Sequence, residues 1–306
     1  MFLYYAFALV IESELRFPEL KTYGVKTLFV PDVVIRFGEV SSTGLNCPRL
    51  TSLFYQANQC ELWLNVPNVA LFLITDGQTI TINPCPGVDE ASLRLFLLGS
   101  CMGALLMQRD LFLLHGNGVK VGKVCVSFVG QSGAGKSTLS GAFFKRGYSV
   151  LADDICAING DGDVLPGFPQ IKLWCDAAKK LNISTAGLRK IRPCVEKFAV
   201  PLGAQFYEEA LPLRVVYHLH SHNRDDFCFS GIVGMQKLTP LQRNSYRVNY
   251  IKGFAKTKMH LGHCGRIANQ IALVNIKRPD TGFKLDELVN LVERDLHAKG
   301  YLDACE

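Results

Sequence analysis

The chain has 306 residues, 48% of them hydrophobic, which allows one large domain or two ordinary ones with a sizeable core and argues against a disordered protein. The net charge of +6 suits anionic small molecules, but the long basic runs typical of nucleic-acid binding are missing, so no nucleic-acid partner is expected. Eleven cysteines are scattered singly without a C-x-x-C pair, a usage typical of reduced thiols in a cytoplasmic protein.

Residues 1–87 are predicted to form a small, mostly β domain. The apolar start, Met1 to Ile11, lacks a positively charged segment and is too short to cross a membrane, so it is predicted to be a strand. Asp76-Gly77 between two apolar runs predicts a hairpin, and Pro84-Cys85-Pro86-Gly87 marks the domain boundary. The strand-like runs are residues 33–37, 60–64, 70–74 and 79–82.

Residues 88–306 are predicted to form a second, α/β domain. It opens with a long buried helix from about Asp89 to Arg109, whose apolar stretch we assign to the core and not to a membrane. Residues 116–121 and 123–129 are then predicted to pair as strands across a turn at Gly122.

The most informative motif follows the second of these strands and fits the pattern G-x-x-x-x-G-K-[ST] of phosphate-binding loops. Its residues are Gly130, Gln131, Ser132, Gly133, Ala134, Gly135, Lys136, Ser137 and Thr138. Backbone N–H groups and the start of the following helix attract phosphates, Lys136 adds a positive charge, and the Ser137 hydroxyl can bind Mg²⁺. ATP, or another nucleoside triphosphate, with Mg²⁺ is therefore the predicted ligand set.

An acidic pair, Asp153-Asp154, lies 17 residues after Lys136, behind a helix that Gly147 is expected to end and a buried strand at 148–152 that closes a βαβ unit. On an extended backbone, neighbouring side chains point in different directions. One carboxylate can thus serve Mg²⁺ and the other the acceptor hydroxyl. We assign Asp153 to the metal together with Ser137, and Asp154 to the hydroxyl proton, although the reverse order and a solvated turn pair stay open.

The core resembles the HPr kinase/phosphorylase family in three pieces, in order and in spacing. These are His115-Gly116, the loop Gly130 to Ser137, and Arg146-Gly-Tyr-Ser-Val-Leu-Ala-Asp153-Asp154. The resemblance implies a P-loop fold related to that of phosphoenolpyruvate carboxykinase, phosphorylation of a serine hydroxyl, and a place in the active site for His115 and both aspartates. It covers residues 110–160 well.

Outside that core, the chain resembles the HPr-kinase-like proteins of peptide natural-product clusters, of which lasso-peptide precursor kinases are the best known. The Arg-Gly-rich signature of the bifunctional enzymes is missing, so kinase activity without phosphorylase activity is expected. The shared segments are Phe17-Pro18-Glu19-Leu20, Leu97-Leu-Gly-Ser100, Pro169-Gln-Ile-Lys-Leu-Trp174 and Leu241-Gln-Arg-Asn-Ser-Tyr246.

Lys172 is the last catalytic candidate. It lies in what is predicted to be a loop leading into a helix, and could neutralise charge on the transferred phosphoryl group. A basic cluster around Pro193, formed by Arg189, Lys190, Arg192 and Lys197, is either a phosphate-binding loop or solvated surface. His218, His220 and His222 alternate but lack a fourth ligand at close spacing, so no zinc site is predicted. Further helices are expected near 175–181, 238–251 and 285–299, and strands at 213–219 and 271–276.

The leading prediction is an ATP-dependent kinase whose acceptor is a serine hydroxyl in a peptide or protein, most simply a precursor peptide. A kinase for a small molecule such as free serine, and a nucleotide-binding regulatory protein without turnover, are the alternatives. Screening acceptors separates the first two, and ATP binding without transfer would favour the third. The acceptor, the number of phosphates added and the oligomeric state stay open.

Overall fold

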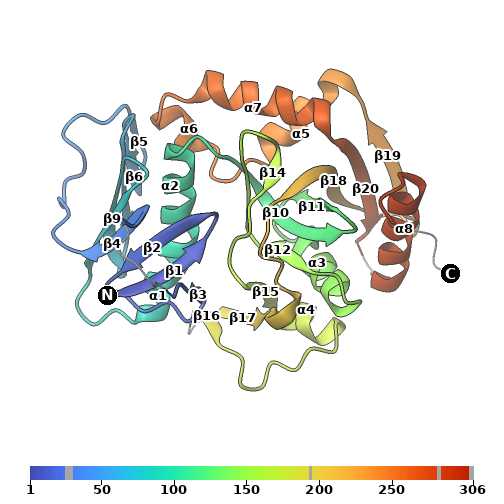
Figure 1. Cartoon of the computed structure of the whole chain (residues 1–306), viewed down its shortest axis with the longest axis horizontal. Coiled ribbons are helices and arrows are strands. Elements are labelled where there is room, and N and C mark those ends of the chain that lie inside the picture. The colour runs from blue at the N-terminus through green and yellow to red at the C-terminus, as the bar shows by residue number, and fades with distance from the viewer. Residues whose placement is uncertain (25–29, 193–194, 281–283, 303–306) are drawn as a thin grey trace.

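The computed structural model describes residues 1–24, 30–192, 195–280 and 284–302, which fold into a mixed α/β structure with three sheets (Figure 1). One sheet is built from the N-terminal third of the chain, the second contains the predicted loop, and the third is a small edge sheet.

The N-terminal sheet has nine strands within the described residues, in the order β3-β1-β2-β4-β9-β8-β7-β6-β5. The predicted single strand at the start is instead a hairpin, because Phe7 and Ala8 take positive φ values of 54° and 59° and turn the chain. The hairpin predicted at Asp76-Gly77 is confirmed. The strands are β1 (Phe2–Ala6), β2 (Leu9–Ser13), β3 (Lys21–Thr22), β4 (Val33–Phe37), β5 (Leu50–Thr51), β6 (Tyr55–Ala57), β7 (Glu61–Val66), β8 (Ala70–Thr75) and β9 (Thr79–Pro84).

The predicted long helix is confirmed as α1 (Glu90–Phe96), a π-helical segment η1 (Leu97–Cys101) and α2 (Met102–Gln108). Asp89 caps its start by accepting a hydrogen bond from the Ser92 N–H at 2.8 Å. By length and composition, residues 90–108 form the one described helix that could cross a membrane, but 72% of its apolar window is buried inside the protein. Its apolar residues pack against the N-terminal sheet, so the core accounts for them.

The second sheet has eight strands within the described residues. The pairing predicted across Gly122 is confirmed, with Val121 opposite Val124. The strands are β10 (Phe112–Val121), β11 (Val124–Gly130), β12 (Val150–Ala152), β13 (Ile155–Ile158), β14 (Asp163–Val164), β18 (Leu211–His222), β19 (Cys228–Ile232) and β20 (Ala272–Pro279).

The predicted βαβ unit is present, and a further strand, β10, lies between its two strands. Both β11 and β12 pair with β10 in antiparallel fashion, so they run in the same direction with β10 between them. The helix α3 (Lys136–Lys145) makes the crossover, and Gly147, at φ 94°, follows its end as predicted. On its other edge β11 pairs with β18 in parallel, and β18 pairs with β20 in parallel. The ends of β11 and β20 therefore lie close to the same loop.

The remaining elements surround this sheet (Figure 1). The helix predicted over 238–251 is wrong, because residues 244–248 break it into two short helices against the end of β10. The 14-residue helix α7 was not predicted. The elements are β15 (Gln170–Trp174), β16 (Lys190–Arg192) and β17 (Val195–Pro201) of the third sheet, α4 (Cys175–Lys180), η2 (Gly203–Gln205), η3 (Gly234–Lys237), α5 (Leu238–Arg243), α6 (Asn249–Gly253), α7 (Thr257–Gln270) and α8 (Leu285–Ala298).

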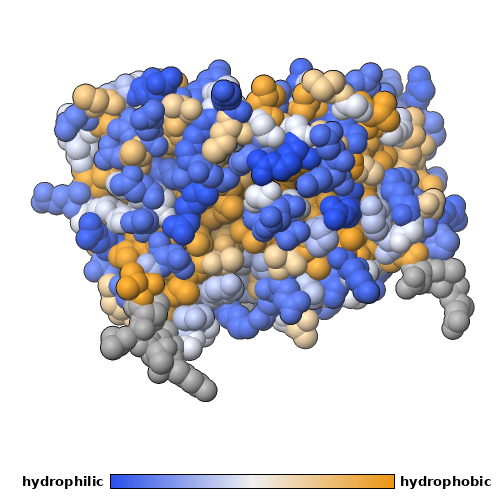
Figure 2. Space-filling model, turned by 45° about the horizontal axis from the view of Figure 1, so that its top comes forward, coloured by the Kyte–Doolittle hydropathy of each residue, from blue (hydrophilic) through white to orange (hydrophobic). Residues whose placement is uncertain are grey.

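Buried apolar residues form three clusters, of which the first combines the N-terminal sheet, the long helix and residues from β10, β13 and the segment 246–254. The face drawn in Figure 2 is largely hydrophilic, with smaller apolar patches between the charged residues. All nine cysteines within the described residues are free, and Cys125 and Cys156 are buried.

Candidate active site

The loop from Gly130 to Gly135 joins β11 to α3 in the strand–loop–helix arrangement that the motif predicts. Glycine is required at its first position, because φ is 148° and an added Cβ would lie 2.5 Å from the carbonyl oxygen of Leu219. Gly133 and Gly135 also take positive φ values, of 83° and 100°. Within the described residues no side chain caps the start of α3, so its first N–H groups are available to an anion.

Lys136 folds back over this loop. Its side chain is 8% exposed, and Nζ donates to the carbonyl oxygens of Gly130 at 2.8 Å and Gln131 at 3.2 Å. Burial lowers the pKa of Lys136, although Asp154 acts in the opposite direction. A bound phosphate would give this partly desolvated ammonium a charged partner in place of two neutral ones.

Arg278, at the end of β20, braces the loop from the other side. Its Nε donates to the carbonyl oxygen of Ala134 at 2.9 Å and its Nη2 to that of Gly133 at 3.2 Å. The sequence did not point to this residue. No local signal could have found it, since 144 positions separate it from Ala134 and only the β11–β18–β20 pairing brings the two together.

The two aspartates lie in a break between β12 and β13. Both strands pair with β10, β13 at residues 112–115 and β12 at residues 118–119, with a register shift between Gly118 and Val119. The pairs His115–Ile155 and Gly118–Ala152, which are in register with each other, set Asp153 opposite Asn117. Asp154 leaves the ladder with φ 65°, so the extended backbone expected for the pair is wrong at this residue. The two carboxylates still point into different surroundings.

Asp153 points into the protein and is 5% exposed. One carboxylate oxygen accepts a short hydrogen bond from the Asn117 side chain, and the other accepts one from the Lys172 N–H at 2.8 Å. Burial, together with the charge of Asp154, raises the pKa of Asp153 to about 6. The solvated turn expected as the alternative for this pair therefore does not describe Asp153.

Asp154 forms an ion pair with Lys172, whose Nζ lies 2.9 Å from Oδ2. Burial alone would raise the pKa of Asp154, but the charges of Lys172 and Lys197 hold it well below its usual range. The same pairing raises the pKa of Lys172 against the effect of burial. Lys172 is on strand β15 and 7% exposed, so its predicted place in a loop is wrong.

His115 stands beside Asp154, at the end of the β10–β13 pairing. Its Nδ1 lies 3.1 Å from the Asp154 carbonyl oxygen. Because that oxygen can only accept, Nδ1 carries the proton and Nε2 is the free nitrogen of the neutral ring. Burial, and then the charge of Lys136, lowers the pKa of His115, which keeps the ring neutral near pH 7.

A cleft of about 410 Å³ brings several of these residues together. It is lined by five predicted site residues, namely His115, Gly130, Gln131, Ser132 and Asp154, and by residues 243–247, for which no role was predicted. Two main-chain hydrogen bonds fix that segment to β10, from the His115 N–H to the Asn244 carbonyl at 2.7 Å and from the Tyr246 N–H to the Leu113 carbonyl at 2.8 Å. The cleft is thus bounded by the loop, the acidic break and this segment.

The part of the chain that the structure describes contains no group of three or more His, Cys, Asp or Glu side chains placed to hold a metal ion. A nucleotide-bound Mg²⁺ needs only one or two protein carboxylates, with phosphates and water as its other ligands. The donors here fit that requirement, since Asp154 lines the cleft and Ser137 lies in the first turn of α3. Both Asp153 oxygens already accept hydrogen bonds, so its assignment to the metal stays a prediction.

The alternating histidines lie along β18, which extends to His222. His218 Nδ1 and His220 Nε2 are 3.0 Å apart, whereas His222 Nε2 lies 2.8 Å from the Asp226 carbonyl oxygen. His218 also lies within 3.1 Å of the Asn244 side chain behind the cleft. His218 and His220 therefore both have side-chain hydrogen-bond partners within the protein.

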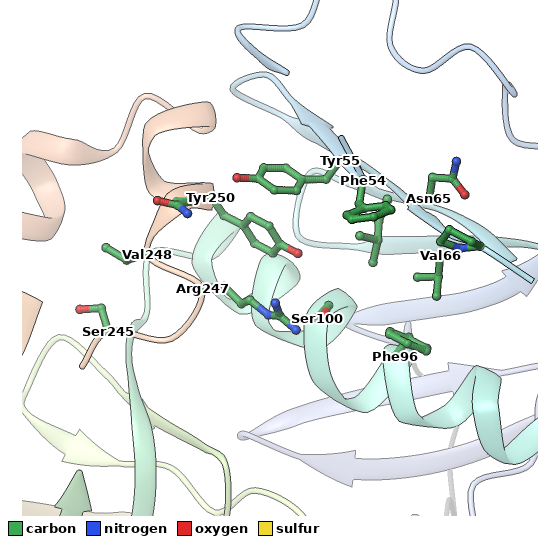
Figure 3. A pocket seen from close by; sticks show the side chains of 13 residues that line it. Phe54, Tyr55, Asn65, Val66, Phe96, Ser100, Ser245, Arg247, Val248 and Tyr250 are labelled. Carbon is green, nitrogen blue, oxygen red and sulfur yellow. The ribbon is translucent and has the colours of Figure 1, made fainter. Parts of the chain in front are cut away.

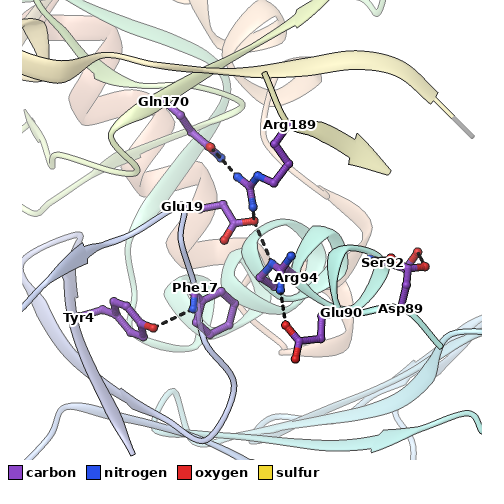
Figure 4. A network of polar contacts seen from close by, with 9 residues as sticks. All are labelled: Tyr4, Phe17, Glu19, Asp89, Glu90, Ser92, Arg94, Gln170 and Arg189. Carbon is purple, nitrogen blue, oxygen red and sulfur yellow. Dashed lines mark hydrogen bonds and ion pairs between the residues drawn. The ribbon is translucent and has the colours of Figure 1, made fainter. Parts of the chain in front are cut away.

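The basic cluster belongs to the β16–β17 hairpin, whose residues 193–194 lie outside the described residues. Arg189 contacts Glu19, and its Nη2 donates to Gln170 Oε1 at 3.2 Å (Figure 4). Glu19 also pairs with Arg94 of the long helix, at 3.1 Å. This network joins the N-terminal segment to β15, the strand that carries Lys172.

No protein-family profile and no curated protein matches the chain. Among solved structures it is similar to the HPr(Ser) kinase/phosphatase from Coxiella burnetii, with 16% sequence identity, coverage of 62% of this chain and 93% of that one, and a TM-score of 0.29.

Proposed function

We propose that this protein is an ATP-dependent kinase that transfers a phosphoryl group to the serine hydroxyl of a peptide or protein. The observation that carries the proposal is that one cleft of about 410 Å³ contains both a glycine-rich loop leading into a helix and an aspartate paired with a buried lysine. The loop and the helix that follows it can bind phosphates. The aspartate–lysine pair is suited to orienting a hydroxyl acceptor.

On the phosphate side, the loop N–H groups, the start of α3 and Lys136 bind the β- and γ-phosphates. Lys136 exchanges its bonds to the Gly130 and Gln131 carbonyls for charged phosphate oxygens. Arg278 keeps the loop in shape through the Gly133 and Ala134 carbonyls. These contacts position the γ-phosphate in a loop that already has the required shape.

On the acceptor side, Asp154 accepts the hydrogen bond of the incoming serine hydroxyl. Its low pKa keeps it ionised, so it orients the hydroxyl and takes its proton late, as suits a loose transition state with little demand for a strong base. Lys172 balances the charge of Asp154 and the negative charge around the transferred group. His115 holds the Asp154 backbone in place through Nδ1.

When bound, Mg²⁺ would neutralise charge on the phosphates. Ser137 and an aspartate are its proposed ligands, with Asp153 as the sequence-based choice and Asp154 as the carboxylate that lines the cleft. The resemblance to lasso-peptide precursor kinases supports a precursor peptide as the acceptor. A serine in a flexible segment is expected, because its hydroxyl has to reach in line with the γ-phosphate.

The test compares Lys136→Ala with Lys258→Ala, an exposed lysine on α7, in ATP binding and in transfer to serine peptides followed by mass spectrometry. We expect about 10- to 100-fold weaker ATP binding for Lys136→Ala, as for loss of one charge-assisted hydrogen bond. The Lys258→Ala variant should behave like the unaltered protein. Full transfer by Lys136→Ala, or no transfer to any peptide by the unaltered protein, would refute the proposal.

A further inference from the structure

A second cavity, of about 540 Å³, adjoins the first. It lies between the N-terminal sheet, the long helix and the segment 245–250, which approach it from three sides (Figure 3). Its apolar lining comes mainly from Phe54, Tyr55, Val66, Phe96, Val248 and Tyr250. The volume falls within the usual range for sites that enclose a ligand group.

The cavity keeps large apolar side chains in contact with solvent. Phe54 is 48% exposed and Val248 is 40% exposed, although burying such side chains is favourable. Polar side chains also line it, among them that of Asn65, which can hydrogen-bond to a peptide main chain. An occupant that brings apolar surface would therefore gain free energy here.

The two cavities share part of their lining. Ser245 and Arg247 line both. Tyr246, between them, packs against the long helix, where an added Cβ at Gly103 would lie 2.5 Å from its ring. Because main-chain bonds also tie this segment to β10, it forms a fixed wall between the acidic break and the apolar cavity.

We propose that this second cavity binds an apolar side chain of the acceptor peptide, near in sequence to the phosphorylated serine. The inference rests on the proposed function. Through Ser245 and Arg247 the cavity adjoins the cleft that is lined by Asp154, the residue assigned to the acceptor hydroxyl. A ligand that fills both spaces needs an apolar group and a hydroxyl on one chain, and a peptide with a bulky aliphatic or aromatic residue close to its serine has both.

The experiment uses a positional library of serine-centred peptides with Mg-ATP and measures transfer by mass. With the unaltered protein we expect one or two positions near the serine to prefer bulky apolar residues over alanine. In Val248→Asp, kcat/KM for the preferred peptide should fall about tenfold or more through KM, while the alanine peptide changes little. Phe54→Ala, at an exposed position, should reduce the same preference.

The matched control is Val233→Asp, the same change at a valine that is 69% exposed and lines neither cavity, and it should keep the preference. Transfer without any apolar preference, or a preference that survives in both Val248→Asp and Phe54→Ala, would overturn the inference and leave the kinase proposal standing. Weaker Mg-ATP binding in Val248→Asp would overturn it in favour of a nucleotide base in the cavity. Absence of transfer to every peptide would overturn both proposals.

Discussion

Asp153 and Asp154 are neighbours with opposite electrostatic environments. Asp153 is buried among hydrogen-bond donors and its pKa is raised to about 6, whereas Lys172 holds the pKa of Asp154 low. The side chain of Asp154 is 25% exposed and lines the cleft. The pair therefore separates a structural carboxylate, which fixes the Lys172 backbone, from one that can reach a substrate.

Substitution should separate these roles. Asp154→Asn is expected to keep Mg-ATP binding and reduce kcat by about 10²- to 10⁴-fold, because the amide cannot accept the hydroxyl proton. Asp153→Asn would place an NH₂ group against the Asn117 or Lys172 donors, and should lower the free energy of unfolding by about 1–3 kcal/mol. Nucleotide titration, peptide turnover and thermal melting measure the three quantities.

The assignment would be reversed if Asp154→Asn lost Mg²⁺-dependent binding while Asp153→Asn remained as stable as the unaltered protein. Two fully active variants would remove both residues from the site.

The site residues that lie close together in the sequence could be predicted. The loop glycines, Lys136 and the aspartate pair stand in one stretch, so strand, loop and helix bring them together without information from elsewhere. Arg278 and Asn117 could not be predicted as partners, because their contacts depend on strand order and register. The positive φ of Asp154 likewise follows from the interrupted ladder on β10 and not from its own sequence.

At the scale of elements, Glu19 connects three of them. It is 7% exposed and pairs with Arg94 of α1 and Arg189 before β16, and Arg189 reaches Gln170 on β15. A carboxylate between two arginines compensates their burial only while it stays charged. The network therefore links the N-terminal segment to the strand that positions Lys172.

Two carboxylates pair with the same arginine and allow a controlled comparison. The side chain of Glu19 is 7% exposed, whereas that of Glu90, which also pairs with Arg94, is 64% exposed. Glu19→Gln should lower the free energy of unfolding by about 3 kcal/mol, because it leaves charges without a charged partner inside the protein. Glu90→Gln should cost less than about 1 kcal/mol. Urea titration of both variants gives the comparison, and equal losses would contradict the structural reading.

Turn chemistry made several elements predictable, since Asp76-Gly77, Gly122 and Gly147 each mark a local reversal or helix end. β15 and the break at 244–248 were missed for a different reason. β15 becomes a strand by pairing with β17, and residues 244–248 leave the helical pattern to bond to β10. Such tertiary pairing overrides local periodicity.

At the scale of the whole molecule, buried histidines are expected to limit the stability of the fold at acidic pH. Burial lowers the pKa of His218 and of His260 to about 4. The second cause is the charge of His220 for His218 and that of His263 for His260. A neutral histidine that gains a proton only after unfolding stabilises the fold above pH 6.5, and this contribution is lost as the pH falls toward 4. Asp153 acts in the opposite sense, since its contribution is lost as the pH rises through about 6.

Because burial lowers the pKa of several histidines and raises that of one carboxyl in this window, we expect the melting temperature to fall between pH 6.5 and 4. His260→Gln should reduce the fall, since a glutamine does not titrate and can still contact Ser245. The exposed His297 on α8 provides the control, and His297→Gln should leave the pH profile unchanged. A melting temperature that rises on acidification would contradict the expectation.

The first apolar cluster has a consequence for cooperativity. It contains residues of the N-terminal sheet, the long helix, β10, β13 and the segment 246–254, so it crosses the boundary predicted at residue 87. A fragment comprising residues 88–306 would expose the surface that the sheet covers, and the cavity wall formed by β6 and β7 would be gone. Calorimetry should accordingly show a single transition with equal calorimetric and van't Hoff enthalpies, and mild proteolysis should release no stable C-terminal piece.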